Sequence, residues 1–367
     1  MNRSSEELRL ILEKALSAPK RLSRAEIARL VAVSSPEETA AVRRAAYALK
    51  RRHCGDFVSL RGLVEVGNRC GKDCYYCGIR RSNSALRRYH LSVGEVETLA
   101  AAAAELQLGS LVLQGGELAT AAEDDFITEC LERIAPFGLG VTLSFGERDE
   151  AVYRRWKAAG AARYLLRIET SSPRLYAALH PADHSFERRK ECLDALRRTG
   201  YQVGTGVMCA LPGQTADDLA GDILFFAEKD ADMIGMGPYI PHPDTPLRAT
   251  APSVPAAERL NLALNMISAT RLYLHDVNIA ATTALEALAP DGREQGVLAG
   301  ANVMMPNLTF PERRREYSLY AGKPDEAGTA AARLAALEKS LSAIGERINF
   351  GRRGDSVHFA LRTGGAA

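Results

Sequence analysis

The chain has 367 residues, of which 46% are hydrophobic and 25% are charged, and this is enough to bury one large core. Its 47 Lys and Arg residues nearly balance 45 Asp and Glu residues, and the net charge of +2 excludes a general attraction to nucleic acid or to an anionic membrane. No apolar stretch reaches the roughly 20 residues that a membrane helix needs, and the charged N-terminus lacks a secretion signal, so we expect a cytoplasmic protein.

The first 55 residues predict an N-terminal helical extension. Leu and Ala recur there with the period of an α-helix, and Ser23 with Glu26 forms the pattern of a capping box. From residue 56 to residue 322, short apolar runs alternate with helical patterns. The eight runs are 60–66, 110–114, 140–145, 163–169, 203–211, 233–237, 278–284 and 302–306.

This alternation predicts an α/β fold. Eight strands that each lead into a helix favour a closed (β/α)8 barrel of the TIM type over residues 56–322. A doubly wound open sheet is the alternative. Residues 323–367 predict a C-terminal helix and tail.

Three of the seven cysteines, Cys70, Cys74 and Cys77, lie within eight positions directly after the first predicted strand. In a reducing compartment this C-x3-C-x2-C spacing indicates metal or redox chemistry instead of disulfides. Three thiolates can bind three irons of a 4Fe-4S cluster and leave the fourth iron without a protein ligand. That iron could chelate S-adenosylmethionine (SAM), and reductive cleavage of SAM would give a 5′-deoxyadenosyl radical. Tyr76 occupies the aromatic position of the radical-SAM version of this motif.

Two other metal sites remain as alternatives for the cysteine loop. A zinc knuckle needs a fourth ligand, and His53 and His90 flank the region. An electron-transfer ferredoxin would need a fourth cysteine nearby, and the sequence has none there.

Function in a barrel lies at the carboxyl ends of the strands, so polar residues there are candidates for the site. The second predicted strand ends in a glycine pair whose backbone could approach the SAM ammonium group; the candidates are Gln114, Gly115, Gly116 and Glu117. Thr142 and Ser144 share one face of the third strand. The apolar end of the fifth strand, including Met208, could line the adenine.

The fourth predicted strand places Arg163, Arg167 and Glu169 on one face. Charges on a barrel strand must meet a ligand or one another, because unpaired burial is costly. Glu169 could therefore accept hydrogen bonds from SAM, and Arg188 or Arg189 could bind the SAM carboxylate. An internal Arg–Glu pair is the alternative.

Nine sequence strings, in order and spacing, resemble the HydE family of radical-SAM maturases of FeFe-hydrogenases. They are CGKDCYYCGIRRSN, LVLQGGE, VTLSFGE, RYLLRIET, LPGQT, GPYIPHPDTPL, ATTAL, ANVMMPN and YSLYAGK, and the likeness covers roughly residues 40–322. The stretch RRSNSALRRY also resembles methylornithine synthase, so a mutase that acts on an amino-acid-like substrate is the alternative enzyme.

The resemblance implies roles for individual residues and partners. Ser144, Glu169, Arg188 and Arg189 would bind SAM. The interior cavity or the cysteine portion of the substrate would be contacted by Thr142, Arg163, Arg167, Thr282, Thr283, Tyr317 and Tyr320. The substrate would be a cysteine-bound iron complex that carries carbon monoxide and cyanide. The resemblance also implies a monomer, an external electron donor and other hydrogenase maturases as partners, with no nucleic acid and no membrane.

Two positions depart from the family pattern near the predicted pocket, and they leave the substrate open. Residue 168 is Ile where His is expected, and residue 115 is Gly where Ser is frequent. No cysteine follows Cys209, so we expect no second cluster and no sulfur insertion of the biotin synthase kind. A metal-binding carrier that delivers iron is the non-enzymatic alternative.

Overall fold

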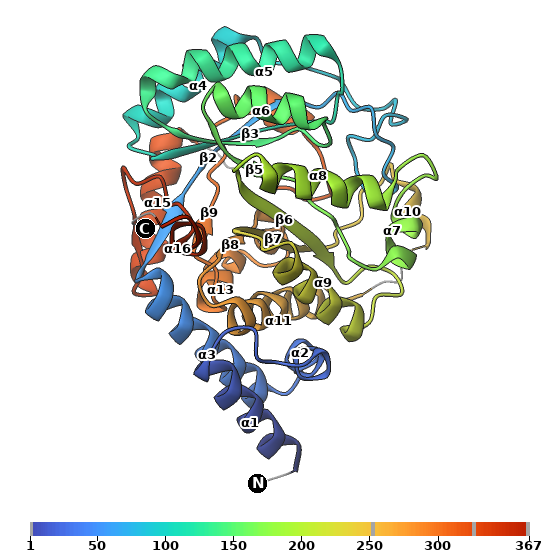
Figure 1. Ribbon diagram of the computed structural model, residues 1–367, viewed down its shortest axis with the longest axis vertical. Helices are drawn as coiled ribbons and strands as arrows, with labels where there is room; N and C mark the ends of the chain where they lie inside the picture. The colour runs from blue at the N-terminus through green and yellow to red at the C-terminus, as the bar shows by residue number, and fades with distance from the viewer. Residues whose placement is uncertain (1–2, 251–253, 325–327, 365–367) are drawn as a thin grey trace.

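The structure is a computed structural model that describes residues 3–250, 254–324 and 328–364. Its strands form one curled sheet with helices on the outside (Figure 1). The strands are β1 (Phe57–Leu60), β2 (Gly62–Gly67), β3 (Ser110–Gly115), β4 (Gly140–Ser144), β5 (Ala161–Leu165), β6 (Gln202–Cys209), β7 (Met233–Pro238), β8 (Asn278–Ala281), β9 (Val303–Met304) and β10 (Arg347–Ile348).

Helices precede the sheet, cross between its strands and close the chain. The first group is α1 (Arg3–Ser17), α2 (Arg24–Val31) and α3 (Pro36–Cys54). The second is α4 (Val93–Glu105), α5 (Ala121–Ile134), α6 (Glu150–Ala158), α7 (Pro173–Leu179), α8 (Phe186–Arg198), α9 (Ala216–Glu228), α10 (Pro246–Thr250), α11 (Ala256–Leu274), α12 (Thr283–Glu286) and α13 (Gly292–Leu298). The last is α14 (Pro311–Glu316), α15 (Ala330–Ala343) and α16 (Val357–Thr363).

The sheet is parallel throughout, in the order β10-β1-β9-β8-β7-β6-β5-β4-β3-β2. The predicted alternation of strands and helices is confirmed, but the described chain has ten strands instead of eight. Arg61 divides the first expected strand into β1 and β2, and β10 arises from the tail. Because helices connect successive strands and the strands are parallel, the carboxyl ends of the strands lie at one edge of the curled sheet.

The prediction of a fully closed barrel is corrected to a TIM-like half-barrel. In the described ranges no ladder joins β1 to β2, because β1 pairs with β9 and β10 while β2 pairs with β3. Backbone hydrogen bonds still draw the two ends of the curl together. The amide of Leu63 donates to the carbonyl of Pro306 at 2.8 Å, and the amide of Leu308 donates to the carbonyl of Leu63 at 2.8 Å.

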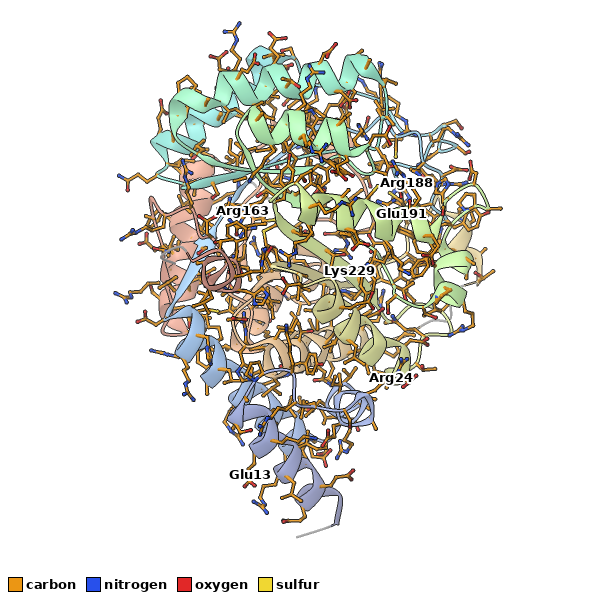
Figure 2. All side chains as sticks on the ribbon, viewed as in Figure 1. Glu13, Arg24, Arg163, Arg188, Glu191 and Lys229 are labelled. Carbon is orange, nitrogen blue, oxygen red and sulfur yellow. The ribbon has the colours of Figure 1, made fainter. Side chains whose placement is uncertain are left out.

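The N-terminal helices lie at one end of the molecule and pack on the crossover helices (Figure 1). The predicted capping box of Ser23 and Glu26 is present at the start of α2. Arg24 of α2 forms an ion pair with Asp217 at 2.7 Å, which joins α2 to α9 (Figure 2). None of the helices in the described ranges is long and apolar enough to span a membrane.

A C-terminal strap, residues 352–356, crosses the amino-terminal ends of the strands. Ser110 Oγ donates to the carbonyl of Arg353 at 2.6 Å, and the amide of Ser356 donates to Gln202 Oε1 at 3.0 Å. Arg163, which is fully buried, forms an ion pair with Asp355 at 2.5 Å. The prediction that Arg163 contacts substrate is therefore corrected, because its side chain is held by the strap at the opposite end of the sheet from the cysteine loop.

Candidate active site

The cysteine loop follows β2 and is held by backbone hydrogen bonds to three other loops. The amide of Gly71 donates to the carbonyl of Glu117 at 2.7 Å. The amide of Tyr75 donates to the carbonyl of Leu179, and that of Gly78 to the carbonyl of Leu319, both at 2.9 Å. Segments that are far apart in the sequence thus fix the loop at the carboxyl ends of the strands.

The three thiols of Cys70, Cys74 and Cys77 lie close enough to influence one another's charge. Burial raises the pKa of all three, for Cys74 to about 12, and the pKa of Cys77 is raised further by Cys74 and Cys70. Three such thiols ionise together only if a cationic group binds them. Their chemistry therefore fits an iron-sulfur cluster.

A zinc ion would need four ligands around one point, whereas cluster thiolates each bind a different iron. Among the residues that the structure describes, no three His, Cys, Asp or Glu side chains are placed to hold one metal ion.

Gly116 lets the end of β3 lie directly against the cysteine loop. A Cβ atom at this position would lie 2.0 Å from the carbonyl oxygen of Arg69, so no larger residue fits without displacing the loop. The amide of Glu117 then reaches Cys70 Sγ at 3.3 Å. At Gly115, a Cβ atom would lie 2.8 Å from the ring of Phe145, which explains locally why Ser is absent there.

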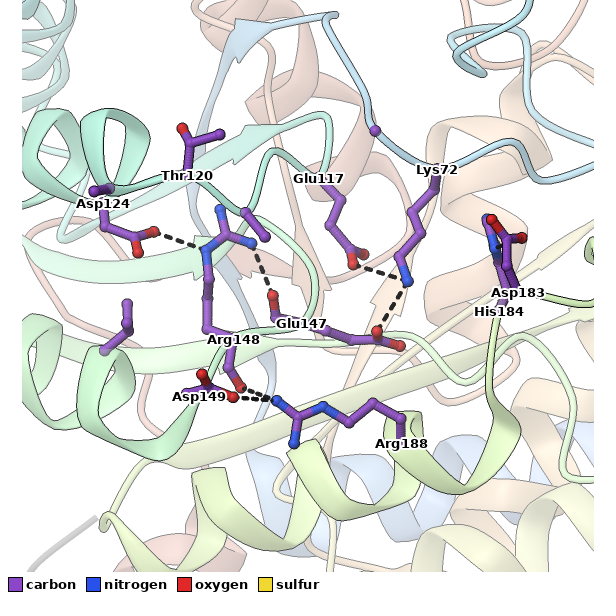
Figure 3. Close-up of a pocket in the computed structure, with 14 residues that line it drawn as sticks. Lys72, Glu117, Thr120, Asp124, Glu147, Arg148, Asp149, Asp183, His184 and Arg188 are labelled. Atoms are coloured by element: carbon purple, nitrogen blue, oxygen red, sulfur yellow. Dashed lines mark hydrogen bonds and ion pairs between the residues drawn. The ribbon is translucent and has the colours of Figure 1, made fainter.

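An ion network of Lys72, Glu117, Glu147 and Arg189 lies beside the thiols. Figure 3 shows its members Lys72, Glu117 and Glu147. Lys72 Nζ lies 3.4 Å from Glu117 and 3.0 Å from Glu147, while Arg189 lies 3.4 Å from Glu117 and 2.8 Å from Glu147. Burial opposes ionisation of Glu147, yet Arg189 and Lys72 hold its pKa below the usual value. The network holds the predicted residues Glu117 and Arg189 in a charge-balanced group.

The sequence reasoning missed Lys72 and Glu147. Lys72 stands between the first two cysteines, and Glu147 directly follows Gly146, whose φ of +79° gives the chain its turn after β4. A charged residue next to a glycine at a strand end is the signal that could have identified Glu147.

A pocket of about 520 Å³ lies on the other side of this network (Figure 3). Its walls include Lys72, Glu117, Glu147, Asp149, His184 and Arg188. Arg188 forms an ion pair with Asp149 at 2.6 Å, whereas its neighbour Arg189 is turned toward Glu117 and Glu147. The two arginines, which the sequence offered as equivalent, therefore have different partners.

Arg167 and Glu169 form a two-pronged ion pair at the carboxyl end of β5. The Nε and Nη2 atoms of Arg167 each lie 2.9 Å from a carboxylate oxygen of Glu169. The expected internal pair is therefore present, although Arg163 takes no part in it. Ile168, between the two, is fully buried in the hydrophobic core. The expectation that residue 168 lies near the pocket stays a prediction.

Glu169 has a φ of +66°, a conformation that costs energy for a residue other than glycine. Asp222 of α9 secures the turn that follows. Its Oδ1 atom accepts hydrogen bonds from the amide of Ser171 at 2.5 Å and from the Ser171 hydroxyl at 2.7 Å. Asp222 is a third residue that the sequence reasoning missed, because only the fold brings α9 behind this turn.

Polar side chains from several strand ends meet above the sheet. Gln114 Nε2 donates to Tyr317 Oη at 3.1 Å, and the hydroxyls of Thr283 and Tyr320 lie 2.8 Å apart. Thr282 donates to the carbonyl of Met236 at 3.1 Å. The structure therefore brings together Thr283 and Tyr320, and Tyr317 with Gln114, while Thr282 contacts the backbone of β7.

The remaining predicted residues lie along the same strands. Ser144 stands beside Gln114 in the ladder of β3 and β4. Thr142 is buried, and its hydroxyl has no hydrogen-bond partner among the described residues. Met208 is half-buried and packs with Tyr76 against a small apolar cluster that includes Leu179. Tyr76 also meets the ring of His180 edge-on, with 5.6 Å between the ring centres.

Comparison with known proteins gives both a family and close structural neighbours. Residues 64–226 match the family model described as the radical SAM superfamily. The chain is 45% identical over 278 residues to a curated protein of Thermotoga maritima, described as the [FeFe] hydrogenase maturase subunit HydE. The match covers 75% of this chain and 77% of that protein.

Two solved structures share the fold at low sequence identity. Methylornithine synthase (PylB) aligns with a TM-score of 0.77 at 21% identity, covering 93% of this chain and 98% of that one. HydG, described as a maturase of the [FeFe]-hydrogenase, aligns with a TM-score of 0.78 at 19% identity, covering 94% of this chain and 76% of that one.

Proposed function

We propose that this chain, which belongs to the HydE family of radical SAM enzymes, cleaves SAM at a 4Fe-4S cluster during assembly of the FeFe-hydrogenase active site. One observation carries the proposal: a loop with three thiols lies directly against a glycine pair at the end of β3. The metal-binding loop and the backbone at the end of β3 are therefore in contact. A cofactor bound through its amino acid portion to a metal in the loop could also hydrogen-bond to this backbone.

In this proposal Cys70, Cys74 and Cys77 hold the cluster. When bound, the cluster supplies an iron without a protein ligand and the electron that cleaves SAM. The backbone from Gln114 to Glu117 accepts hydrogen bonds from the SAM ammonium group. Arg189 stabilises negative charge on Cys74, and it is held in a charge-balanced group with Lys72, Glu117 and Glu147.

Other predicted residues form the rest of the SAM site. Glu169 accepts hydrogen bonds from SAM, and the bidentate contact with Arg167 fixes the direction of its carboxylate. Ser144 and Tyr76 border the cofactor, and Met208 lines the adenine. Arg189 binds the SAM carboxylate; Arg188, paired with Asp149, closes the outer side.

For the substrate we propose a cysteine-bound iron complex with two carbon monoxide ligands and one cyanide. The candidate contacts are Thr142, Arg167, Thr282, Thr283, Tyr317 and Tyr320. The buried hydroxyl of Thr142, without a partner among the described residues, supports this assignment, because a buried polar atom needs a hydrogen bond. A methylornithine synthase-like mutase remains the second candidate. The string RRSNSALRRY, which resembles that enzyme, lies just after the three cysteines.

The setting of the reaction belongs to the same proposal. We place the protein in the cytoplasm as a monomer, with residues 56–322 as the catalytic half-barrel, 1–55 as its helical extension and 323–367 as its tail. An external protein donates the electron, and other hydrogenase maturases supply and receive the iron complex. Neither nucleic acid nor membrane takes part.

Anaerobic reconstitution tests the enzymatic role. The protein is loaded with iron and sulfide, reduced with dithionite and supplied with SAM, and 5′-deoxyadenosine is measured. Cys74→Ala should lose the product and much of the bound iron and sulfide. Cys130→Ala, which removes a buried thiol from the core, is the matched control and should keep both. Equal iron content and equal product in the two variants would contradict the proposal, and iron binding without product in the unaltered protein would favour a carrier.

A further inference from the structure

A second pocket, of about 220 Å³, lies where the chain leaves α14. Its walls include Arg314, Arg315, Ser318, Tyr320 and Lys323. The hydroxyl of Tyr320 contacts Thr283, the first residue of α12, just beyond β8. Tyr320 therefore stands between this outer pocket and the polar residues above the sheet.

Arg314 carries a buried positive charge in the wall of this pocket. It is only 7% exposed, and its Nε and Nη1 atoms are buried without a hydrogen-bond partner in the part of the chain that the structure describes. A buried guanidinium is stable only when its N–H groups are paired, because it stays charged at every physiological pH. An arginine in this state needs an anion.

The nearby carboxylate does not satisfy this need. Glu65 is almost fully buried and forms an ion pair with Lys323, whose ammonium also donates to the carbonyl of Tyr317 at 3.0 Å. One carboxylate therefore faces two buried or half-buried cations, Lys323 and Arg314. The buried Nε and Nη1 atoms of Arg314 have no hydrogen-bond partner among the described residues, and a single negative charge placed against them would balance this guanidinium.

We propose that this pocket binds a small carboxylate against Arg314. The volume suits a carboxylate on a short side chain or an amino acid, and excludes a nucleotide such as the SAM adenosine. Resting on the function proposed above, the carboxylate is that of the amino acid ligand of the substrate. The pocket then serves as an outer docking site for the substrate. Tyr320 and Tyr317 lie between this site and the interior.

Acetate is the probe for the test, because it presents a carboxylate without an amine or a thiol. The thermal unfolding midpoint of the full chain is measured without SAM, in sodium acetate and in sodium chloride of equal ionic strength. Acetate should raise the midpoint by about 2 °C over chloride. Arg314→Met should lose this difference, and Arg44→Met, which removes an exposed arginine from α3, should keep it.

Crystals soaked in 3-bromobenzoate, an aryl bromide that does not alkylate thiols, give a readout that does not depend on a variant that folds. The bromine should appear by anomalous scattering in the pocket beside Arg314. An empty pocket, an undiminished acetate effect in Arg314→Met, or an equal response to acetate and chloride would overturn the carboxylate assignment. These measurements involve no SAM cleavage, so their failure is distinct from failure of the proposed enzymatic function.

Discussion

At the scale of single residues, Gly116 connects the sequence most directly to the proposed chemistry. Gly116→Ala would place a methyl group 2.0 Å from the carbonyl oxygen of Arg69, so the cysteine loop must move. We expect a loss of about 1–3 kcal/mol of stability, as for other overpacked sites, together with reduced cluster content after reconstitution. Gly94→Ala is the matched control: no atom lies within 4 Å of the added Cβ, and the position is helical. Equal cluster content in the two variants would contradict a close contact between Gly116 and the cysteine loop.

Asp222 predicts a pH dependence. Burial raises its pKa from 3.8 to about 7, although Ser171 donates two hydrogen bonds to it. Because the folded pKa lies above the unfolded one, the stability that this group contributes is complete below pH 3.8 and is lost as the pH rises through about 7.

Asp222→Asn should remove this loss, since its carbonyl oxygen can accept the same hydrogen bonds. The stability of the variant relative to the unaltered protein should therefore increase by on the order of a few kcal/mol between pH 4 and pH 8. Urea unfolding at the two pH values measures the difference. A difference that stays constant with pH would show that Asp222 is ionised throughout.

Residues at strand ends could be predicted from the sequence, and residues defined by long-range packing could not. The cysteines, Gly116 and Glu169 follow directly from the alternation of strands and helices. Arg163 was assigned wrongly because its partner, Asp355, lies in a tail whose path no local pattern reveals. Asp222 was missed for a similar reason, since its contact with Ser171 depends on the packing of α9.

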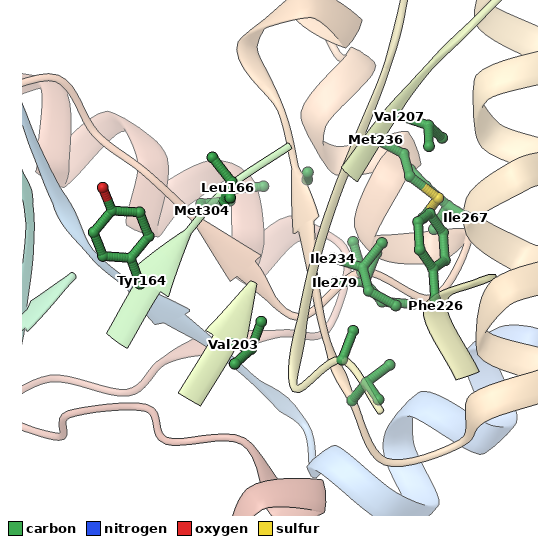
Figure 4. Packing of buried hydrophobic residues seen from close by; sticks show 14 of the residues in the cluster. Tyr164, Leu166, Val203, Val207, Phe226, Ile234, Met236, Ile267, Ile279 and Met304 are labelled. Carbon is green, nitrogen blue, oxygen red and sulfur yellow. The ribbon is translucent and has the colours of Figure 1, made fainter. Parts of the chain in front are cut away.

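At the scale of elements, strands with a local apolar pattern could be predicted, and a strand that depends on long-range packing was missed. The outer faces of β6, β7 and β8 carry Val207, Ile234 and Ile279, which pack with Phe226 of α9 and Ile267 of α11 (Figure 4). These apolar runs made the central strands easy to recognise. β10 is two residues long, Arg347 and Ile348, and carries no such pattern.

The C-terminal segment is joined to α3 by a fully buried ion pair of Lys50 and Glu346, to which Tyr47 adds a hydrogen bond at 2.8 Å. Glu346→Ala would leave Lys50 buried without its partner. We expect a loss of about 3–5 kcal/mol in the free energy of unfolding, measured with urea. Glu13→Ala, which removes an exposed partner of Arg9 on α1, should cost less than about 1 kcal/mol. Similar losses in both variants would show that the buried pair does not hold the tail.

At the scale of the whole molecule, the curl of the sheet brings distant segments to one edge. The cysteine loop contacts Leu179 and Leu319 through its backbone, and His242, between β7 and α10, lies 3.1 Å from the hydroxyl of Ser318. The sequence predicted this assembly because parallel strands place all their carboxyl ends together. It did not predict the half-barrel, since closure depends on how two short strands, β1 and β9, pair with their neighbours.

In the proposed site, Cys70, Cys74 and Cys77 leave one iron of the cluster free to bind SAM. The most direct measurement is electron-nuclear double resonance on the reduced, anaerobically reconstituted protein with SAM labelled with ¹⁵N at its amino group and ¹⁷O at its carboxylate. Both labels should couple magnetically to the cluster. Absence of both couplings in protein with a complete cluster, or zinc in place of iron in the loop, would contradict this assignment.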